Sequence, residues 1–201
     1  MSSDLHTFLR SRRSVRHYLP QKVPEEVLLR VLETTTYAPS AHNRQPWRIV
    51  ILASLEARWH LAEAISKKLA ADMIADGSAP AEIQTRVERT IRRTNDAPLA
   101  ILLCRDVTQV ETQPDASRKE IEAEMGRQSV AAAGLQLLLA SEAEGLSGTW
   151  ICWPLFAQAE TRQALDLPSE WEPQAMVFLG YPRDHPEPPP RKSLSEIVRY
   201  V

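Results

Sequence analysis

Three arginines and a serine lie close together near the start of the chain, in a pattern suited to holding a phosphate. They are Arg12, Arg13, Ser14 and Arg16. A guanidinium group matches a phosphate with two parallel hydrogen bonds, and a serine hydroxyl adds a further donor. The same residues would also suit the solvated end of a helix, where the helix dipole favours cations. Because no aromatic residues are interleaved with them, their support for nucleic-acid binding is weak.

A second polar segment, Ala-Pro-Ser-Ala-His-Asn-Arg-Gln-Pro-Trp at residues 38–47, joins the end of an expected helix to the start of an expected strand. Loops held between rigid elements are favoured binding sites. Ser40 and Asn43 are equally good turn formers, and Trp47 would fit in a core. The residues alone leave a binding role and a structural role equally open.

Two further groups are candidates for contact with a ligand. Arg191 and Lys192 follow a proline-rich stretch, and Trp150, Cys152 and Trp153 could wall a ring-shaped ligand. For both groups an ordinary explanation leads, since basic pairs are usually exposed and aromatic residues usually belong to the core. No histidine lies near Cys152 in the sequence, which argues against a nucleophilic cysteine.

Composition restricts the classes of function. The net charge of −2 gives no global attraction for nucleic acid or an anionic membrane, so any anion site must be local. No apolar run is long enough to span a bilayer, the N-terminus lacks a signal-peptide core, and the two cysteines show no disulfide spacing, which together predict a cytoplasmic protein. The five histidines are scattered, which predicts no metal site. Glycine-rich nucleotide loops of the Walker and G-x-G-x-x-G kinds are absent.

The periodicity of apolar residues predicts the elements that position these groups within one domain of residues 1–201. Strands are expected at 47–53, 98–104, 149–152 and 174–180. Helices are expected at 4–12, 24–38, 55–75, 81–94, 118–144 and 160–165.

Two segments of the chain stand apart from this plan. The helical pair at about 55–95 is rich in charge and thin in large apolar residues, so it could be a mobile excursion over a site rather than part of the core. The C-terminal arm at about 182–201 begins with many prolines, which favour an extended conformation. Apolar residues follow these prolines, which suggests that the arm docks, for example on a partner subunit.

The longest expected helix, at 118–144, is apolar on nearly every side between Val130 and Ala140. A helix that is apolar all round is buried, so it would be a central core helix or the spine of a dimer. Gly126 and Gly134 lie inside it, where each costs about 1 kcal/mol relative to alanine. A packing reason is expected, such as the close approach of another backbone.

Taken in order, these motifs resemble the FMN-dependent nitroreductase family. Residues 12–16 look like its R-x-S-x-[RK] phosphate motif, and residues 38–47 are similar to its A-P-S-x-x-N-x-Q-P-W signature. Residues 145–150 look like its G-L-G-[ST]-x-W segment, and residues 180–182 with 191–192 look like its closing motif. Each motif is weak alone, but the ordered set spans nearly the whole chain and is highly specific.

The resemblance implies an α+β, nitroreductase-like fold, in which helices surround a central, mostly antiparallel sheet of four to five strands. It also implies a domain-swapped homodimer that holds FMN between its subunits. The implied FMN-binding residues are Arg12, Arg13, Ser14, Arg16, Pro39, Ser40, Ala41, Asn43, Gln45, Trp150, Ile151, Cys152, Arg191 and Lys192.

The roles of these residues follow from the same resemblance. Arg12, Arg16 and Arg191 would hold the FMN phosphate, and residues 39–45 would reach the flavin from the other subunit. Trp150 and Ile151 would lie along one face of the ring, and the amide of Cys152 would lie near the flavin N5. Hydride transfer needs no side-chain acid or base, so no catalytic residue is predicted.

The implied activity is that of an FMN-dependent NAD(P)H oxidoreductase. NAD(P)H would reduce FMN, and FMNH2 would reduce a flat, electron-poor acceptor such as a nitroaromatic or quinone-like compound, in one pocket and with ping-pong kinetics. Residues 59–99 resemble the C-terminal flavin domain of deazaflavin-coenzyme glutamate ligases, so reduction of a dehydro-deazaflavin coenzyme precursor is an alternative. A flavin-consuming enzyme and a non-catalytic flavin-binding protein are further alternatives.

Overall fold

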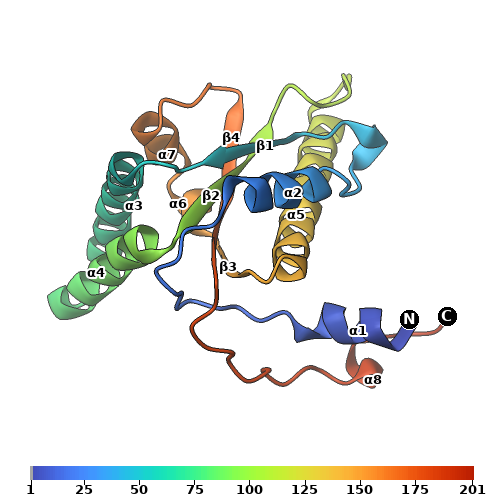
Figure 1. Cartoon of the computed structure of the whole chain (residues 1–201). Coiled ribbons are helices and arrows are strands. Elements are labelled where there is room, and N and C mark those ends of the chain that lie inside the picture. The colour runs from blue at the N-terminus through green and yellow to red at the C-terminus, as the bar shows by residue number, and fades with distance from the viewer. Residues whose placement is uncertain (1) are drawn as a thin grey trace.

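The centre of the fold is a four-stranded sheet in which every neighbouring pair is antiparallel. Across the sheet the order is β1 (Trp47–Ile51), β2 (Leu99–Asp106), β4 (Trp171–Gly180) and β3 (Ser147–Ile151). A computed structural model describes residues 2–201, and its helices lie on both faces of this sheet (Figure 1). The predicted α+β class with a mostly antiparallel sheet is therefore confirmed.

The helices divide between the two faces of the sheet. The helices, with one short 3-10 turn, are α1 (Ser2–Ser11), α2 (Glu25–Thr35), η1 (Ala41–Asn43), α3 (Leu55–Ala75), α4 (Pro80–Asp96), α5 (Ala116–Ala143), α6 (Trp153–Phe156), α7 (Gln158–Ala164) and α8 (Leu194–Ile197). One apolar cluster joins α2 and α5 to the sheet, and a second joins α3, α6 and α7 to its other face.

Strand β2 is buried along its whole length because it lies between β1 and β4 and has helices on both faces. Successive strand residues point to opposite faces. Accordingly, Ile101 and Leu103 pack in the cluster with α5, and Leu102 and Cys104 pack in the cluster with α3. This explains why the sequence here is a continuous apolar run rather than an alternating one.

Helix α5 is buried on one side only. Val130 and Leu137 face the sheet, whereas Leu135 keeps 53% of its surface exposed. A Cβ atom added at Gly134 would lie 2.0 Å from Cζ3 of Trp150, so the glycine makes room for that indole. The expected packing constraint exists here, but the neighbour is a side chain of β3 rather than another backbone.

Helix α3 belongs to the core, so the expectation that the 55–95 pair lies outside the core does not hold for this helix. Leu61 and Ile65 of α3 are buried in the cluster on this face of the sheet. Arg58, also buried, donates hydrogen bonds to the carbonyl oxygens of Leu52 at 2.9 Å and Ala97 at 2.6 Å. The start of α3 is thus fixed to the segments that follow β1 and precede β2.

The first and last parts of the chain pair with each other. The amide of Leu19 donates to the carbonyl of Tyr181 at 2.9 Å, and the amide of Arg183 donates to the carbonyl of His17 at 3.0 Å. Beyond this pairing, α1 and the C-terminal arm with α8 project away from the sheet (Figure 1). Helices long and apolar enough to cross a membrane are absent from residues 2–201.

Candidate functional site

A basic cavity of about 300 Å³ is built from both ends of the chain. Glu187 is the one acid in its lining, so the cavity carries a strong positive charge. The side chains that line it are Arg12, Arg13, Ser14, Arg16, Pro186, Glu187, Pro189 and Arg191. Four of the five basic residues predicted from the sequence are therefore brought together, and Lys192 is not among the lining residues.

The short segment that carries these arginines is held against the edge strand β3. Val15 is buried, and its amide donates to the carbonyl of Gly148 at 3.1 Å. Ser14 and Arg16 flank Val15 in this extended segment, so they point away from the core. Arg13 has a structural task as well, since its Nη1 lies 2.7 Å from the carbonyl oxygen of Arg10 and 2.9 Å from that of Ser11.

An apolar groove of about 290 Å³ continues from this cavity and shares Arg12 and Ser14 with it. The rest of its lining comes from α5 and β3: Ala131, Leu135, Leu138 and Trp150. The indole Nε1 of Trp150 donates to Sγ of Cys152 at 3.0 Å, which orients the ring. A ligand with an anionic end and a flat apolar body would fit the two spaces together.

The residues that follow Trp150 offer backbone rather than side chains to this region. Ile151 is buried in the cluster on the opposite face of the sheet, so a ligand beside Trp150 could contact only its main chain. Cys152 is exposed and ends the free edge of β3, immediately before α6. Because β3 is an edge strand, its outer backbone groups beyond Gly148, whose carbonyl is taken by Val15, are not paired with another strand.

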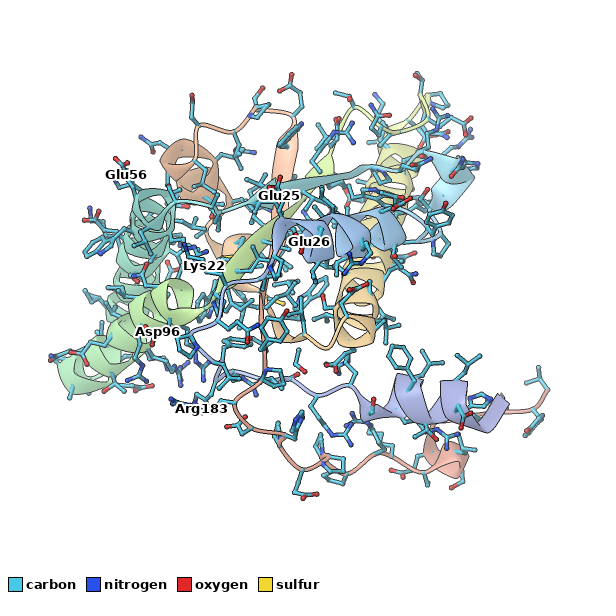
Figure 2. All side chains as sticks on the ribbon, viewed as in Figure 1. Lys22, Glu25, Glu26, Glu56, Asp96 and Arg183 are labelled. Atoms are coloured by element: carbon cyan, nitrogen blue, oxygen red, sulfur yellow. The ribbon has the colours of Figure 1, made fainter. Side chains whose placement is uncertain are left out.

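A second basic cavity, of about 180 Å³, also has Arg16 in its lining. Arg92 and Arg93 of α4 and Arg183 of the arm line it, with Asp96 as its only acidic residue; Asp96 and Arg183 are labelled in Figure 2. Burial lowers the pKa of Arg93, and the neighbouring arginines lower that pKa further. Such crowding of like charges favours occupation by an electron-rich or anionic group.

Thr149 gives this second cavity a hydrogen-bonding group with no partner. Its side chain is buried, it lines the cavity, and its Oγ1 has no partner within residues 2–201. An unpaired buried hydroxyl is costly, so a ligand atom that bonds it would be favoured. Thr149, Arg92, Arg93 and Arg183 were not predicted from the sequence as residues of the site. The only signal for Arg92 and Arg93 was that they are adjacent in a polar helix, and such a pair usually belongs to a solvated helix face.

The loop between α2 and β1 lies at a separate, shallow cavity. Pro39, Ser40 and Ala41 line this space with α5, and it shares no lining residue with the three spaces above. Ser40 Oγ accepts from the amide of Gln45 at 3.0 Å, and Asn43 Oδ1 accepts from the Gln45 side chain at 3.3 Å. Within one chain, the predicted contacts of this loop are therefore not part of the arginine cavities.

The conformation of this loop is unusual. His42, Asn43 and Gln45 have φ angles of 50°, 52° and 49°, in the left-handed region that non-glycine residues rarely adopt. Such strain persists only where surrounding contacts fix the backbone, and it concentrates at functional sites. The amide of Ala41 donates to Ser129 Oγ of α5 at 3.1 Å, which is one of these contacts.

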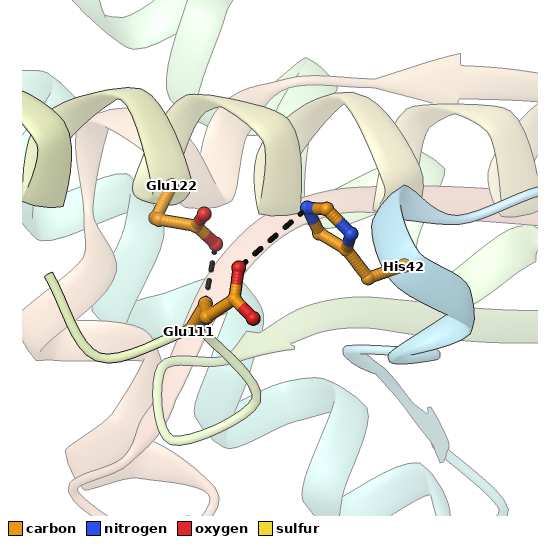
Figure 3. Close-up of side chains that lie close together, drawn as sticks. All are labelled: His42, Glu111 and Glu122. Carbon is orange, nitrogen blue, oxygen red and sulfur yellow. Dashed lines mark hydrogen bonds and ion pairs between the residues drawn. The ribbon is translucent and has the colours of Figure 1, made fainter.

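One group of possible metal ligands lies beside this loop (Figure 3). Ligand atoms of His42, Glu111 and Glu122 are all within 4.8 Å of one another. Glu122 accepts hydrogen bonds from the amide of Glu111 and the side chain of Gln113, both at 3.2 Å. Arg44 lies 3.5 Å from the Glu111 carboxylate. We infer that these side chains have a structural role, since each already has partners in the protein. They hold the loop before β1 close to the loop that contains Glu111.

Comparison with known proteins agrees with this architecture. The family model named Nitroreductase family matches residues 9–181. A 5,6-dimethylbenzimidazole synthase of Rhodospirillum rubrum is 33% identical over 180 residues, which cover 88% of this chain and 82% of that protein. An NADH dehydrogenase of Thermus thermophilus is 29% identical, with 97% of this chain and 95% of that protein covered.

A solved structure shows the same fold. The FMN-dependent nitroreductase NfnB of Mycobacterium smegmatis, crystallised with NADPH, superposes with a TM-score of 0.74 at 20% identity, covering 100% of this chain and 99% of that one. The family match spans most of the chain, and it includes the arginine segment, the strained loop and β3. This chain belongs to the nitroreductase family.

Proposed function

We propose that this chain is an FMN-dependent oxidoreductase, which oxidises NAD(P)H and reduces a flat, electron-poor acceptor. FMN combines a phosphate, an apolar ring system and a polar ring edge. The observation that supports it best is the continuity of the spaces around residues 12–16. The basic cavity shares Arg12 and Ser14 with the apolar groove, and shares Arg16 with the second basic cavity.

Each part of the cofactor then has a partner in the chain. Arg12, Arg16 and Arg191 would bind the phosphate, with a hydrogen bond from Ser14. Trp150 would pack against the apolar ring, and the free edge of β3 would offer backbone groups to it. Arg93 would place positive charge near the polar edge, which favours the reduced flavin. Two solved structures of the same fold, a putative nitroreductase of Desulfovibrio desulfuricans in complex with FMN and NfnB in complex with NADPH, are consistent with this assignment.

When bound, FMN supplies two-electron chemistry at its ring N5. Overall, NAD(P)H and one proton would reduce a quinone to a quinol and release NAD(P)+. Donor and acceptor must both reach the same N5, so they would react with the flavin in turn. Ping-pong kinetics are the expected consequence, and parallel lines in double-reciprocal plots would show them.

The first experiment is an absorbance scan of the purified protein, followed by anaerobic titration with NADH and NADPH. We expect a yellow protein with about one FMN per chain, since each chain holds one set of the three spaces. The nicotinamide should bleach the flavin, and a quinone should restore its colour. A protein that stays colourless after incubation with FMN and desalting would contradict the proposal.

A second candidate function comes from the relative named 5,6-dimethylbenzimidazole synthase, which is 33% identical to this chain. An enzyme of that kind would consume a flavin instead of recycling it. Incubation of the reduced protein in air, with chromatography of the small molecules, separates the two functions. We expect the flavin to survive many turnovers. Loss of FMN with appearance of dimethylbenzimidazole would assign this second function instead.

The site also supports a homodimer, in which residues 39–45 of each chain complete the flavin site of the other. Leu9 of α1 is 52% exposed and Leu194 of α8 is 73% exposed, although both are large apolar residues. Exposed apolar surface of this kind marks an interaction site. A partner subunit that covers α1 and the arm would bury it, and exchange of the arms would make the dimer domain-swapped.

We expect the protein to behave in light scattering as twice its chain mass of 22.7 kDa. Changing both Leu194→Glu and Ile197→Glu should yield monomers and lower FMN occupancy, because charges on this surface would oppose burial by a partner. Leu55→Glu is the control, since Leu55 is also exposed but begins α3 on the other side of the molecule (Figure 1). A dimer that tolerates the double change but not Leu55→Glu would refute the assignment of this surface.

A further inference from the structure

We propose that the cavity between α3, α4 and α6 binds the electron acceptor and selects aromatic acceptors that carry a negative group. This inference rests on the oxidoreductase activity proposed above and narrows its substrate class. The cavity measures about 280 Å³, near the lower end of the roughly 300–1,000 Å³ typical of ligand pockets. A compound with one or two rings suits that size.

The preference for an aromatic acceptor follows from the aromatic and apolar side chains that line the cavity. Trp153 and Phe156 of α6 line the cavity, together with the buried residues Ile65 and Met73 of α3. Phe156 is 74% exposed, although a phenylalanine of this kind is normally covered. Trp153 is held edge-on against Phe178, with ring centroids 6.1 Å apart. A fixed indole and an uncovered phenyl ring offer stacking surfaces to a flat ligand.

The preference for a negative group on the acceptor follows from the cations that line the same cavity and from which of them are already paired with acids. Lys68 of the lining is bonded to Asp72, and Arg86 lies 3.4 Å from Glu82. Arg89 has no ion pair or hydrogen bond among the side-chain contacts of residues 2–201. Its Nε atom is also buried without an acceptor.

Arg89 therefore needs an acceptor that the described chain does not supply. A buried donor without a partner costs free energy, and a carboxylate or sulfonate on the ligand would satisfy it. Asp76 is the remaining acid of the lining, and it is exposed at the C-terminal end of α3. A charge that stands in water opposes an anionic ligand less than a buried charge would.

The position of the cavity links it to the proposed flavin site. Trp153 follows Cys152 directly at the end of the free β3 edge, and Phe178, which Trp153 contacts, lines the second basic cavity. Arg89 lies one helical turn before Arg93 on α4, so the two cavities adjoin along one helix. An acceptor held by Phe156 and Arg89 would thus lie beside the second basic cavity, which is assigned to the polar edge of the flavin ring.

The test compares 4-nitrobenzoate with 4-nitrobenzamide, which differ in charge but hardly in shape, by calorimetry on the FMN-loaded protein. We expect nitrobenzoate to bind at least about tenfold more tightly, since hydrogen bonds to charged groups contribute most. Arg89→Gln should remove this preference, and Phe156→Ala should weaken binding of both compounds. Arg118→Gln is the matched control, because Arg118 is an exposed arginine that pairs with Asp115 outside the cavity.

Bound FMN and NAD(P)H oxidation with the neutral quinone menadione are measured on the same samples. A protein without FMN or without turnover of menadione would disprove the oxidoreductase proposal itself. A protein that holds FMN and reduces menadione, but binds the two nitro compounds equally, would overturn the acceptor pocket alone. Preference for nitrobenzoate that survives Arg89→Gln would also overturn it.

Discussion

Arg16→Ala should weaken FMN binding by about thirtyfold or more, because removal of one partner from a bonded charge pair costs about 2–5 kcal/mol. Arg16 lines both the basic cavity that we assign to the FMN phosphate and the second basic cavity. Its guanidinium is little engaged within the protein, since its one side-chain hydrogen bond is to the carbonyl of Ser14 at 3.0 Å. Arg16→Lys should recover part of the affinity, because lysine keeps the charge but not the paired donors.

Arg10→Ala is the control for this experiment. Arg10 lies in the last turn of α1 and lines none of the basic cavities. Fluorescence titration of FMN into the apoprotein gives the affinities, and circular dichroism shows that the variants are folded. Equal losses in Arg10→Ala and Arg16→Ala would mean that only general charge matters, and no loss in Arg16→Ala would remove the arginine segment from the site.

Arg105→Met should lower the free energy of unfolding by about 1.5–3 kcal/mol, because it removes the nearest cation from the partly buried carboxylate of Glu172 and leaves it Arg127 at 3.5 Å and neighbouring glutamine amides. Arg105 is 5% exposed on β2, and its Nε donates to Glu172 of β4 at 3.1 Å. Its Nη1 donates to the carbonyl of Ala123 in α5 at 3.1 Å. The side chain thus joins two strands to the longest helix.

The cost of this substitution should depend on pH. Burial would raise the pKa of Glu172, but the hydrogen bonds from Arg105 and Gln174 and the charges of Arg105 and Arg127 together outweigh burial and hold that pKa below its ordinary value. A carboxylate with a lowered pKa stabilises the fold above its unfolded pKa of about 4.3, and this stabilisation is lost as the pH falls towards its folded pKa. The difference between Arg105→Met and the unchanged protein should therefore shrink below that pH.

Urea unfolding at several pH values measures this dependence. Glu172→Gln combined with Arg105→Met should cost less than the two single changes added together, because the pair acts as a unit. Arg30→Met is the surface control, since Arg30 pairs with Glu144 at 2.7 Å but is largely exposed. The prediction fails if loss of the exposed pair destabilises as much as loss of the buried one, or if the cost of Arg105→Met is independent of pH.

The sequence predicted the elements with strong periodicity. The apolar run at 98–104 became β2, and the helix expected at 55–75 matches α3 at both ends. Short elements without such a pattern were missed, namely η1, α6 and α8. A helix of one turn has no period to detect, and its geometry comes from tertiary contacts.

The candidate site was predictable in part. Arg12, Ser14 and Arg191 lie in one cavity, as the ordered motifs indicated. Arg93 was not foreseen, because its role depends on where α4 ends relative to Arg16, and that is set by packing in three dimensions. The side chain of Ile151 shows a different limit, since the sequence does not reveal which face of β3 meets the core. The contacts of residues 39–45 with FMN stay a prediction.

Pairing of residues 17–19 with 181–183 has a consequence for how the protein is made. During translation, Arg12 and Arg16 leave the ribosome well before Arg191, because Arg191 lies much later in the chain. Synthesis proceeds at about 5–20 residues per second, so the growing chain lacks the part of the basic cavity that Arg191 lines for several seconds or more. The cavity that we assign to the FMN phosphate would then be complete only after the arm has been synthesised, and fragments that end before the arm would lack Arg191.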